Sequence, residues 1–126
     1  KSGELIVSVS FPARKAIRGK FLRLGQRQAN AISKISVAAS LTLKDGRVDW
    51  AGVALGAVGP TVIRARHTEQ ALIGRPLTTQ VIDAAVRAVQ LEARPIDDVR
   101  STAAYRRRMC GVLLRRMLMS LFAIRA

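Results

Sequence analysis

The dipeptide Asp45-Gly46 is the feature that most constrains how this chain folds. Both residues readily adopt the positive φ angles of a tight two-residue turn, and apolar segments flank them on both sides. We therefore predict an antiparallel hairpin with Lys44 opposite Arg47. An uninterrupted register then places four pairs on one apolar face: Leu43 with Val48, Leu41 with Trp50, Ala39 with Gly52, and Val37 with Ala54. A sheet with such a face needs another layer packed on it.

Two further strands are predicted before the hairpin. Apolar residues alternate along residues 4–11 with the two-residue period of a half-buried strand, and Pro12 ends the pattern. Residues 20–27 alternate again, with Phe21 and Arg23 on one side and Leu22 and Leu24 on the other. This second segment predicts a strand with one polar face.

The second half of the chain has helical periodicity. A short helix is predicted over residues 67–73, because Gly74 and Pro76 are typical of the end of a helix. A longer helix follows, with Thr78 or Thr79 as its N-cap and Pro95 as its limit. Its apolar residues recur at three- and four-residue steps: Ile82, Ala85, Val86, Val89 and Ala93.

A last helix is predicted after Ser101, which is a suitable N-cap. One side of this helix is apolar and comprises Tyr105, Met109, Val112, Leu113 and Met117. Farther along, Leu118, Leu121 and Phe122 are expected to be exposed, either as an interface with a missing part of the protein or as a surface for self-association. Cys110 lies among apolar neighbours, so we expect it to be a buried thiol that packs in the core.

Strands that precede helices indicate an α+β fold. We expect an antiparallel sheet of three to four strands followed by three helices packed on one face. A chain of 126 residues is long enough for one core but not for two, and this one has no internal repeat or flexible linker. Residues 1–126 are therefore predicted to form a single domain.

The charge balance leaves two kinds of partner open. The chain has 22 Lys and Arg against 8 Asp and Glu, a net charge of +14 that attracts polyanions or an acidic partner. Residues 101–126 contain no carboxylate, and their arginines are Arg106, Arg107, Arg108, Arg115, Arg116 and Arg125. Such a surface suits either docking to another domain or subunit, or a basic module that binds RNA or another polyanion. The aromatic residues are scattered and no RNA-recognition motif is present, which disfavours specific nucleic-acid binding.

No set of residues predicts catalysis or metal binding. His67 is the sole histidine, so a histidine-based metal site is excluded. Asp97 and Asp98 precede a predicted helix, where carboxylates stabilise the turn and the helix N-terminus. We accordingly assign no catalytic residue and no metal ligand.

The single cysteine and the lengths of the apolar runs bear on location. One cysteine cannot form an internal disulfide, which indicates a reducing compartment, and we expect the protein to be cytoplasmic. No apolar run reaches the roughly 18 to 20 residues that a membrane-spanning helix needs. We therefore expect no membrane span.

Several segments carry a resemblance to a known family. Arg64-Ala65-Arg66, followed by Glu69, Leu72 and Gly74, fits the pattern R-A-R-x-x-E-x-x-L-x-G. The stretch from Asp98 to Arg106 resembles D-x-R-x-S-x-x-Y-R, with Thr102 in place of Ser. With residues 3–12 and 54–58, these patterns resemble the C-terminal domain of the flavoprotein (medium) subunit of carbon monoxide dehydrogenase. The same domain occurs in molybdenum hydroxylases of the xanthine dehydrogenase and aldehyde oxidoreductase type. The resemblance spans nearly the whole chain.

The resemblance implies a role in an oxidoreductase that carries electrons through FAD. In this family FAD is held mainly by an N-terminal region, whose glycine-rich loops have no counterpart here. The chain begins with Lys1, so we expect it to be a piece of a longer polypeptide that is not active alone and does not bind FAD tightly. The resemblance implies that it closes one side of the flavin site and docks the N-terminal FAD domain and the iron–sulfur and molybdenum subunits.

The resemblance also suggests residues near the cofactor. Arg66 is the first candidate for flavin contact and Arg64 the second, because related enzymes place a cation in the loop after the hairpin. The alternative is that both arginines pair with Glu69 or face solvent. Asp98 and Arg100 are expected to pair with each other or with nearby backbone amides and so position the last helix, with Tyr105 packed beneath.

Overall fold

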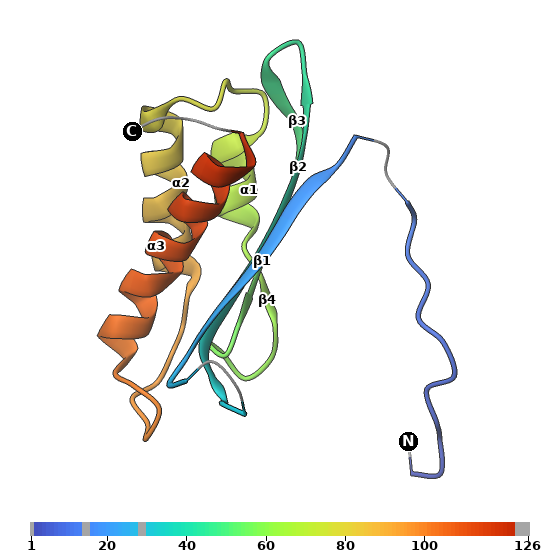
Figure 1. Ribbon diagram of the computed structural model, residues 1–126, viewed down its shortest axis with the longest axis vertical. Coiled ribbons are helices and arrows are strands. Elements are labelled where there is room, and N and C mark those ends of the chain that lie inside the picture. The colour runs from blue at the N-terminus through green and yellow to red at the C-terminus, as the bar shows by residue number, and fades with distance from the viewer. Residues whose placement is uncertain (1, 14–15, 28–29, 123–126) are drawn as a thin grey trace.

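The computed structural model describes residues 2–13, 16–27 and 30–122. A four-stranded antiparallel sheet has the order β1 (Arg18–Gly25), β2 (Ser33–Lys44), β3 (Arg47–Gly56) and β4 (Ile63–Arg64). The helices α1 (Arg66–Leu72), α2 (Thr79–Glu92) and α3 (Ala103–Leu121) follow and cover one face of the sheet (Figure 1). The predicted α+β architecture is confirmed.

The hairpin forms as predicted at the turn, but its register changes farther along. Asp45 and Gly46 have φ angles of 49° and 73°, and Lys44 lies opposite Arg47. A bulge between Thr42 and Leu43 then shifts the pairing by one residue from the prediction. The shifted pairs are Leu41 with Ala51, Ala39 with Val53, and Val37 with Leu55. All six of these residues are buried, so the bulge brings the apolar positions of both strands to the same face.

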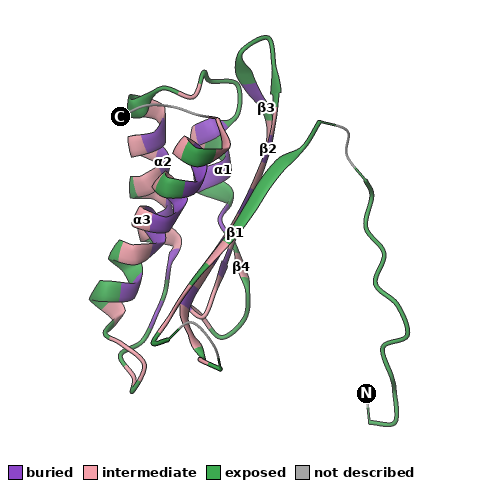
Figure 2. Ribbon diagram, viewed as in Figure 1, coloured by how far each residue is buried: buried purple, intermediate pink, exposed green. Residues whose placement is uncertain are grey.

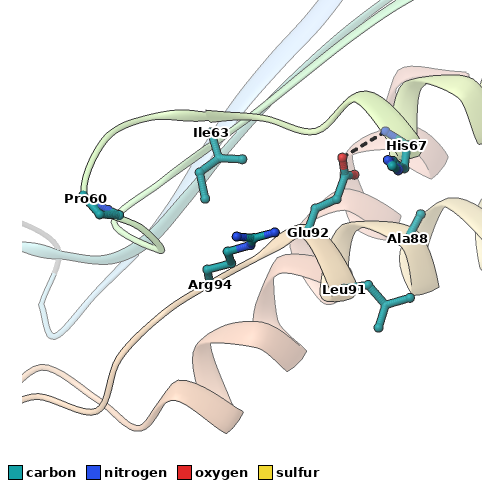
Figure 3. Close-up of a pocket in the computed structure, with 7 residues that line it drawn as sticks. All are labelled: Pro60, Ile63, His67, Ala88, Leu91, Glu92 and Arg94. Carbon is teal, nitrogen blue, oxygen red and sulfur yellow. Dashed lines mark hydrogen bonds between the residues drawn. The ribbon is translucent and has the colours of Figure 1, made fainter.

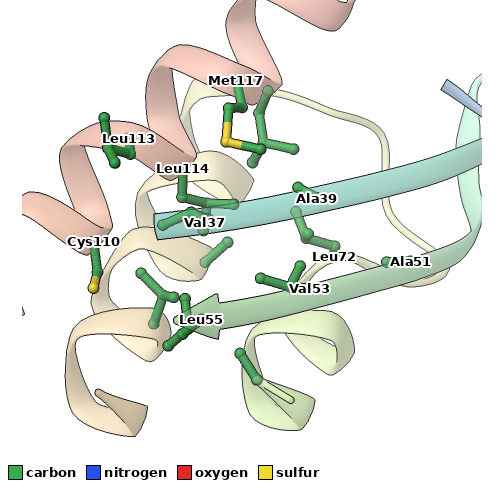
Figure 4. Close-up of a cluster of buried hydrophobic side chains, with 14 of the residues drawn as sticks. Val37, Ala39, Ala51, Val53, Leu55, Leu72, Cys110, Leu113, Leu114 and Met117 are labelled. Carbon is green, nitrogen blue, oxygen red and sulfur yellow. The ribbon is translucent and has the colours of Figure 1, made fainter. Parts of the chain in front are cut away.

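The core lies between that face of the sheet and the three helices. Figure 4 shows β2 and β3 facing α3 across side chains such as Val37, Leu55 and Leu114, and Figure 2 shows the buried positions along this boundary. From α2, Ile82, Ala85 and Val89 are buried as their spacing predicts. Each fully buried Val, Leu or Ile contributes roughly 1.5 to 3 kcal/mol relative to an exposed one.

The start of α3 differs from the prediction by one residue. Thr102, not Ser101, is the N-cap, and its hydroxyl accepts a hydrogen bond of 3.2 Å from the Tyr105 backbone N–H. Ser101 exchanges backbone hydrogen bonds with Asp98 instead. The main chain at Thr102 is extended, the conformation from which an N-cap side chain reaches the first turn.

The buried side of α3 is also rotated from the predicted stripe. Tyr105 is 41% exposed and lies 6.0 Å from the Lys34 ammonium, so it does not pack beneath the turn. Leu118, which we expected to be exposed, is buried with Met117. Cys110 is fully buried, as predicted. Cys110, Leu114 and Leu118 lie four positions apart along α3, so they share one side of the helix. The sheet packs against that side.

The predicted strand at residues 4–11 is wrong. This segment extends away from the sheet and helices in Figure 1, and no described strand pairs with it. Its large apolar side chains are 80 to 91% exposed: Leu5, Ile6, Val7, Val9 and Phe11. Alternation identifies a segment able to form a strand, but a strand also requires backbone partners, and the described sheet supplies none here.

One carboxylate holds the turn that precedes α3. Asp98 accepts hydrogen bonds from Arg100 Nε and Nη2, at 2.9 and 2.6 Å, and from the Arg100 backbone N–H at 2.8 Å. It also forms an ion pair with Arg106, whose side chain is only 2% exposed. The hydrogen bond from Arg100 is the main reason that the Asp98 pKa is lowered to about 2. The predicted contact between Asp98 and Arg100 is confirmed.

We expect Asp98 to make folding sensitive to acid. Its folded pKa lies below the value of the unfolded chain, so its stabilising effect is complete above about pH 4 and is lost as the pH falls toward 2. Thermal unfolding followed by circular dichroism between pH 5 and 2 should show a larger loss of stability in the wild type than in Asp98→Asn. Asp49→Asn is the control, because Asp49 is exposed and has no ion pair in the described structure. Equal pH dependence in all three proteins would contradict this assignment.

The buried thiol gives a second prediction. Burial raises the pKa of Cys110 to about 11, which keeps it protonated near neutral pH. We expect the folded chain to react with a thiol reagent at pH 8 about a hundredfold more slowly than the chain in urea, since only the thiolate reacts. The rate of colour release from an aromatic disulfide reagent measures this. Rapid, stoichiometric labelling of the folded protein would show that Cys110 is accessible.

Candidate functional site

A groove runs between the β3–β4 loop and the segment that follows α2. Its larger part is a cavity of about 650 Å³. The lining residues, drawn in Figure 3, are Pro60, Ile63, His67, Ala88, Leu91, Glu92 and Arg94. In that view Pro60 and Ile63 form one wall, the end of α2 forms the other, and Arg94 lies between them. The cavity is mainly apolar, and its lining includes the charged side chains of Glu92 and Arg94.

Glu92 fixes the position of α1 beside this cavity. Its carboxylate accepts hydrogen bonds from the backbone N–H groups of His67 and Thr68, both at 2.9 Å, and from the Thr68 hydroxyl at 2.6 Å. Negative charge is favourable at a helix N-terminus, where backbone N–H groups have no partner within the helix. The end of α2 is thereby tied to the start of α1.

A second cavity of about 510 Å³ adjoins the first and shares Pro60 and Arg94 with it. The other residues that line it are Ala57, Gly59, Pro95, Ile96, Arg100 and Arg106. Three arginines therefore face one cavity, and none of the lining residues is acidic. This concentration of positive charge favours an anionic ligand or partner group.

The two arginines expected near a flavin lie elsewhere, together at a smaller cavity of about 300 Å³. Arg64 forms a bidentate ion pair with Glu69, with distances of 2.9 Å from Nε to Oε1 and 3.0 Å from Nη2 to Oε2. This contact raises the pKa of Arg64 and matches the alternative raised from the sequence. Arg66 begins α1, is exposed, and has no ion pair in the described structure.

Glu69 also holds the sheet. It is buried, and its Oε1 accepts a hydrogen bond of 2.9 Å from the Val53 backbone N–H. The carboxylate thus joins β3, α1 and Arg64 at the edge of the sheet. Because Arg64 is engaged here, Arg66 is the arginine with freedom to contact a group outside the chain.

Sequence reasoning missed Arg94 and Arg106 as groove residues. Arg106 was grouped with an exposed basic tail, whereas the structure buries it against Asp98. Arg115 of that tail forms an ion pair with Asp83, and Arg125 lies outside the described residues. Helical spacing places Arg106 on the same side of α3 as Cys110 and Leu113, four and seven positions later, but it does not supply the distant partners that allow a charge to be buried.

The described residues contain neither a metal-binding cluster nor a membrane-spanning helix. Across residues 2–13, 16–27 and 30–122, no three His, Cys, Asp or Glu side chains gather in a way that could hold a metal ion. Within the same ranges, no helix has the length and apolar character needed to cross a membrane.

Comparison with known proteins identifies related chains. The family described as CO dehydrogenase flavoprotein C-terminal domain matches residues 20–121. The chain is 29% identical to the carbon monoxide dehydrogenase medium chain of Afipia carboxidovorans over 114 residues, which cover 90% of this chain and 40% of that protein. It is 26% identical to a xanthine dehydrogenase FAD-binding subunit of Escherichia coli O157:H7, covering 91% and 40%. Aldehyde oxidase 1 of Bos taurus is 36% identical over 92 residues, covering 71% and 7%.

Comparison with solved structures leads to the same family of enzymes. The carbon monoxide dehydrogenase from Hydrogenophaga pseudoflava that lacks the molybdenum-pyranopterin moiety matches with a TM-score of 0.81 and 27% identity. That match covers 90% of this chain and 39% of the solved chain. The present chain therefore spans about 40% of the length of the dehydrogenase subunits it matches. On the extent of the match and the shared fold, the chain belongs to the CO dehydrogenase flavoprotein C-terminal domain family.

Proposed function

We propose that this chain is the C-terminal domain of an FAD-binding subunit in a molybdenum hydroxylase-type oxidoreductase. There it closes one side of the flavin site and docks the iron–sulfur and molybdenum subunits. The observation that carries the proposal is the family match over residues 20–121, supported by relatives that are medium chains or FAD-binding subunits. The cytoplasm is the proposed location, since the cysteine is a free, buried thiol.

The residues present suit a partial contact with FAD. No described helix begins at a glycine-rich loop of the kind that cradles a pyrophosphate, so the main binding region is proposed to lie outside this chain. Arg66, exposed at the start of α1, is the proposed contact, with Arg64 held by Glu69 beside it. FAD supplies electron transfer when bound, and a nearby guanidinium stabilises negative charge on its reduced form.

The exposed N-terminal segment supports an interface with the rest of the subunit. Residues 4–11 present alternating apolar side chains to solvent and lie outside the family match. The carbon monoxide dehydrogenase and xanthine dehydrogenase relatives align over 114 and 117 residues. These alignments are longer than the family match to residues 20–121, so they extend beyond it. Exposed apolar side chains in a row are typical of a surface that is covered in an assembly. We assign this segment to contact with the N-terminal FAD domain.

A basic module for RNA receives no support from these observations. The relatives named above are oxidoreductases, and part of the positive charge is absorbed within the fold. Asp98 pairs with Arg106 and Arg100, Asp83 with Arg115, and Glu69 with Arg64. The remaining positive surface fits docking to another subunit.

The proposed function predicts where flavin is found. The 126-residue chain alone should be colourless, whereas the complete subunit that contains it should retain FAD and absorb in the visible flavin bands. In that complete subunit, Arg66→Gln should lower the flavin midpoint potential by about 10 to 40 mV, because the reduced form loses a favourable charge interaction.

The control for this measurement is Arg87→Gln, an exposed arginine on α2 that has no ion pair in the described structure. A complete subunit without flavin would refute the proposed function. A subunit with flavin and an unchanged potential in Arg66→Gln would refute only the contact at Arg66.

The interface of residues 4–11 gives a separate prediction. Thermolysin, which cleaves before large apolar residues, should cut the isolated chain within this segment first, and the complete subunit should protect the same bonds. The double variant Leu5→Ser and Val7→Ser should leave the melting temperature of the isolated chain unchanged but weaken assembly of the complete subunit. Val62→Ser, at another exposed apolar position, is the control. Equal cleavage of residues 4–11 in both proteins would remove the basis for the interface.

A further inference from the structure

We propose that the smaller cavity of the groove is a binding site for a phosphate-type dianion, held by Arg94, Arg100 and Arg106. The site lies between residues 57–60 and 94–100 and is separate from the cavity of Arg64 and Arg66. We infer the site from the charges, burial and contacts of this chain alone, so it does not depend on the proposed flavin function.

The charge of the cavity matches a dianion. Three arginines line it, and a single carboxylate, Asp98, lies behind two of them. Three guanidinium groups and one carboxylate leave an excess of two positive charges around the cavity. The other nearby carboxylates are engaged elsewhere: Asp97 accepts a hydrogen bond from the Ala103 backbone N–H, and Glu92 accepts those at the start of α1. A concave wall with uncompensated positive charge concentrates the field on an anion.

Arg106 is built into the site. Its Nη1 donates to the Ala57 carbonyl at 3.4 Å, and its Nη2 donates to Asp98 and to the Ser101 carbonyl. The side chain is 2% exposed, yet its Nε has no hydrogen-bond partner in the described structure. Because this Nε is closed off from solvent, Arg106 contributes its positive charge to the cavity rather than a direct hydrogen bond from Nε.

Arg94 and Arg100 provide hydrogen-bond donors for the ligand. Arg100 uses its Nε and Nη2 on Asp98, which orients the guanidinium and leaves Nη1 without a hydrogen bond in the described structure. Arg94 has an exposed side chain with no ion pair in the part of the chain that the structure describes. One arginine is thus fixed by burial, one by an ion pair, and one is able to close over the ligand. Arginine suits this task because its planar group donates two parallel hydrogen bonds to a phosphate.

The neighbouring cavity indicates what the phosphate can carry. The two cavities share Pro60 and Arg94, and the larger one is lined mainly by apolar side chains such as Ile63 and Leu91. Most ligand sites combine an apolar cavity with a few polar groups that fix orientation. A phosphate in the arginine cavity can therefore be free, or it can belong to a nucleotide whose remaining atoms occupy the larger cavity.

Isothermal titration calorimetry on the 126-residue chain, in a phosphate-free buffer of low ionic strength, tests the site with inorganic phosphate and with ADP. We expect saturable one-to-one binding, weakened about tenfold or more by Arg94→Gln. Ile96→Glu should weaken it at least as much, because it places a carboxylate in the cavity without removing an arginine. The matched control is Arg116→Gln, an exposed arginine far along α3, which should bind as the wild type does.

The two ligands distinguish the source of the phosphate. Equal affinity identifies the phosphate group alone as the ligand, and ADP binding at least tenfold tighter identifies a nucleotide that also fills the larger cavity; both results support the site. Circular dichroism of each variant checks that the fold is kept. Absence of saturable binding would overturn the proposal. So would equal weakening by Arg94→Gln and Arg116→Gln, because that would reflect only the net charge of +14.

Discussion

The ion pairs of Asp98 are the interaction on which much of this structure depends. One carboxylate binds Arg100 within the turn and the buried Arg106 within α3, so the turn and the helix are held as a unit. Arg106 in turn reaches the Ala57 carbonyl beyond β3, which joins the helix to the end of the sheet. Loss of the carboxylate would leave a buried guanidinium unpaired, a situation that costs several kcal/mol in proteins. The position of α3 and the shape of the groove both follow from this pair.

Three carboxylates have comparable structural roles around the helices. Glu69 ties α1 to β3, Glu92 ties α2 to the start of α1, and Asp98 ties α3 to the turn before it. Each of these carboxylates is buried or partly buried, and each accepts hydrogen bonds from backbone or arginine donors that packing would otherwise leave without partners. Because the chain has 22 Lys and Arg against 8 Asp and Glu, a large positive excess remains after these contacts. That excess is the physical basis for expecting anionic ligands and partner surfaces.

Local signals predicted more of the fold than of the site. The turn at Asp45-Gly46 and the helix ends near Gly74 and Pro95 depend on backbone angles that nearby residues determine, and these features formed as predicted. The bulge after Thr42 was not predicted, since it arises from matching the buried positions of two strands. The segment of residues 4–11 failed for a related reason, because alternation does not supply a partner strand. In the groove, Arg94 and Arg106 come from different elements, and only their packing makes them neighbours.

The sequence by itself determined that strands precede three helices, that a tight turn joins the hairpin, that Thr78 or Thr79 caps the second helix, and that family patterns surround Arg64 and Asp98. Short-range effects govern these features, namely permitted φ angles, helical periodicity and hydrogen bonds between near neighbours. Only the tertiary structure decided that Arg106 is buried, although the formal charge of its neighbours on α3 suggested an exposed tail. It did so because Arg106 finds Ala57, 49 residues away, and Asp98, eight residues away, at the same place. A charge can be buried only where such distant partners converge, and that convergence is a property of the packed fold.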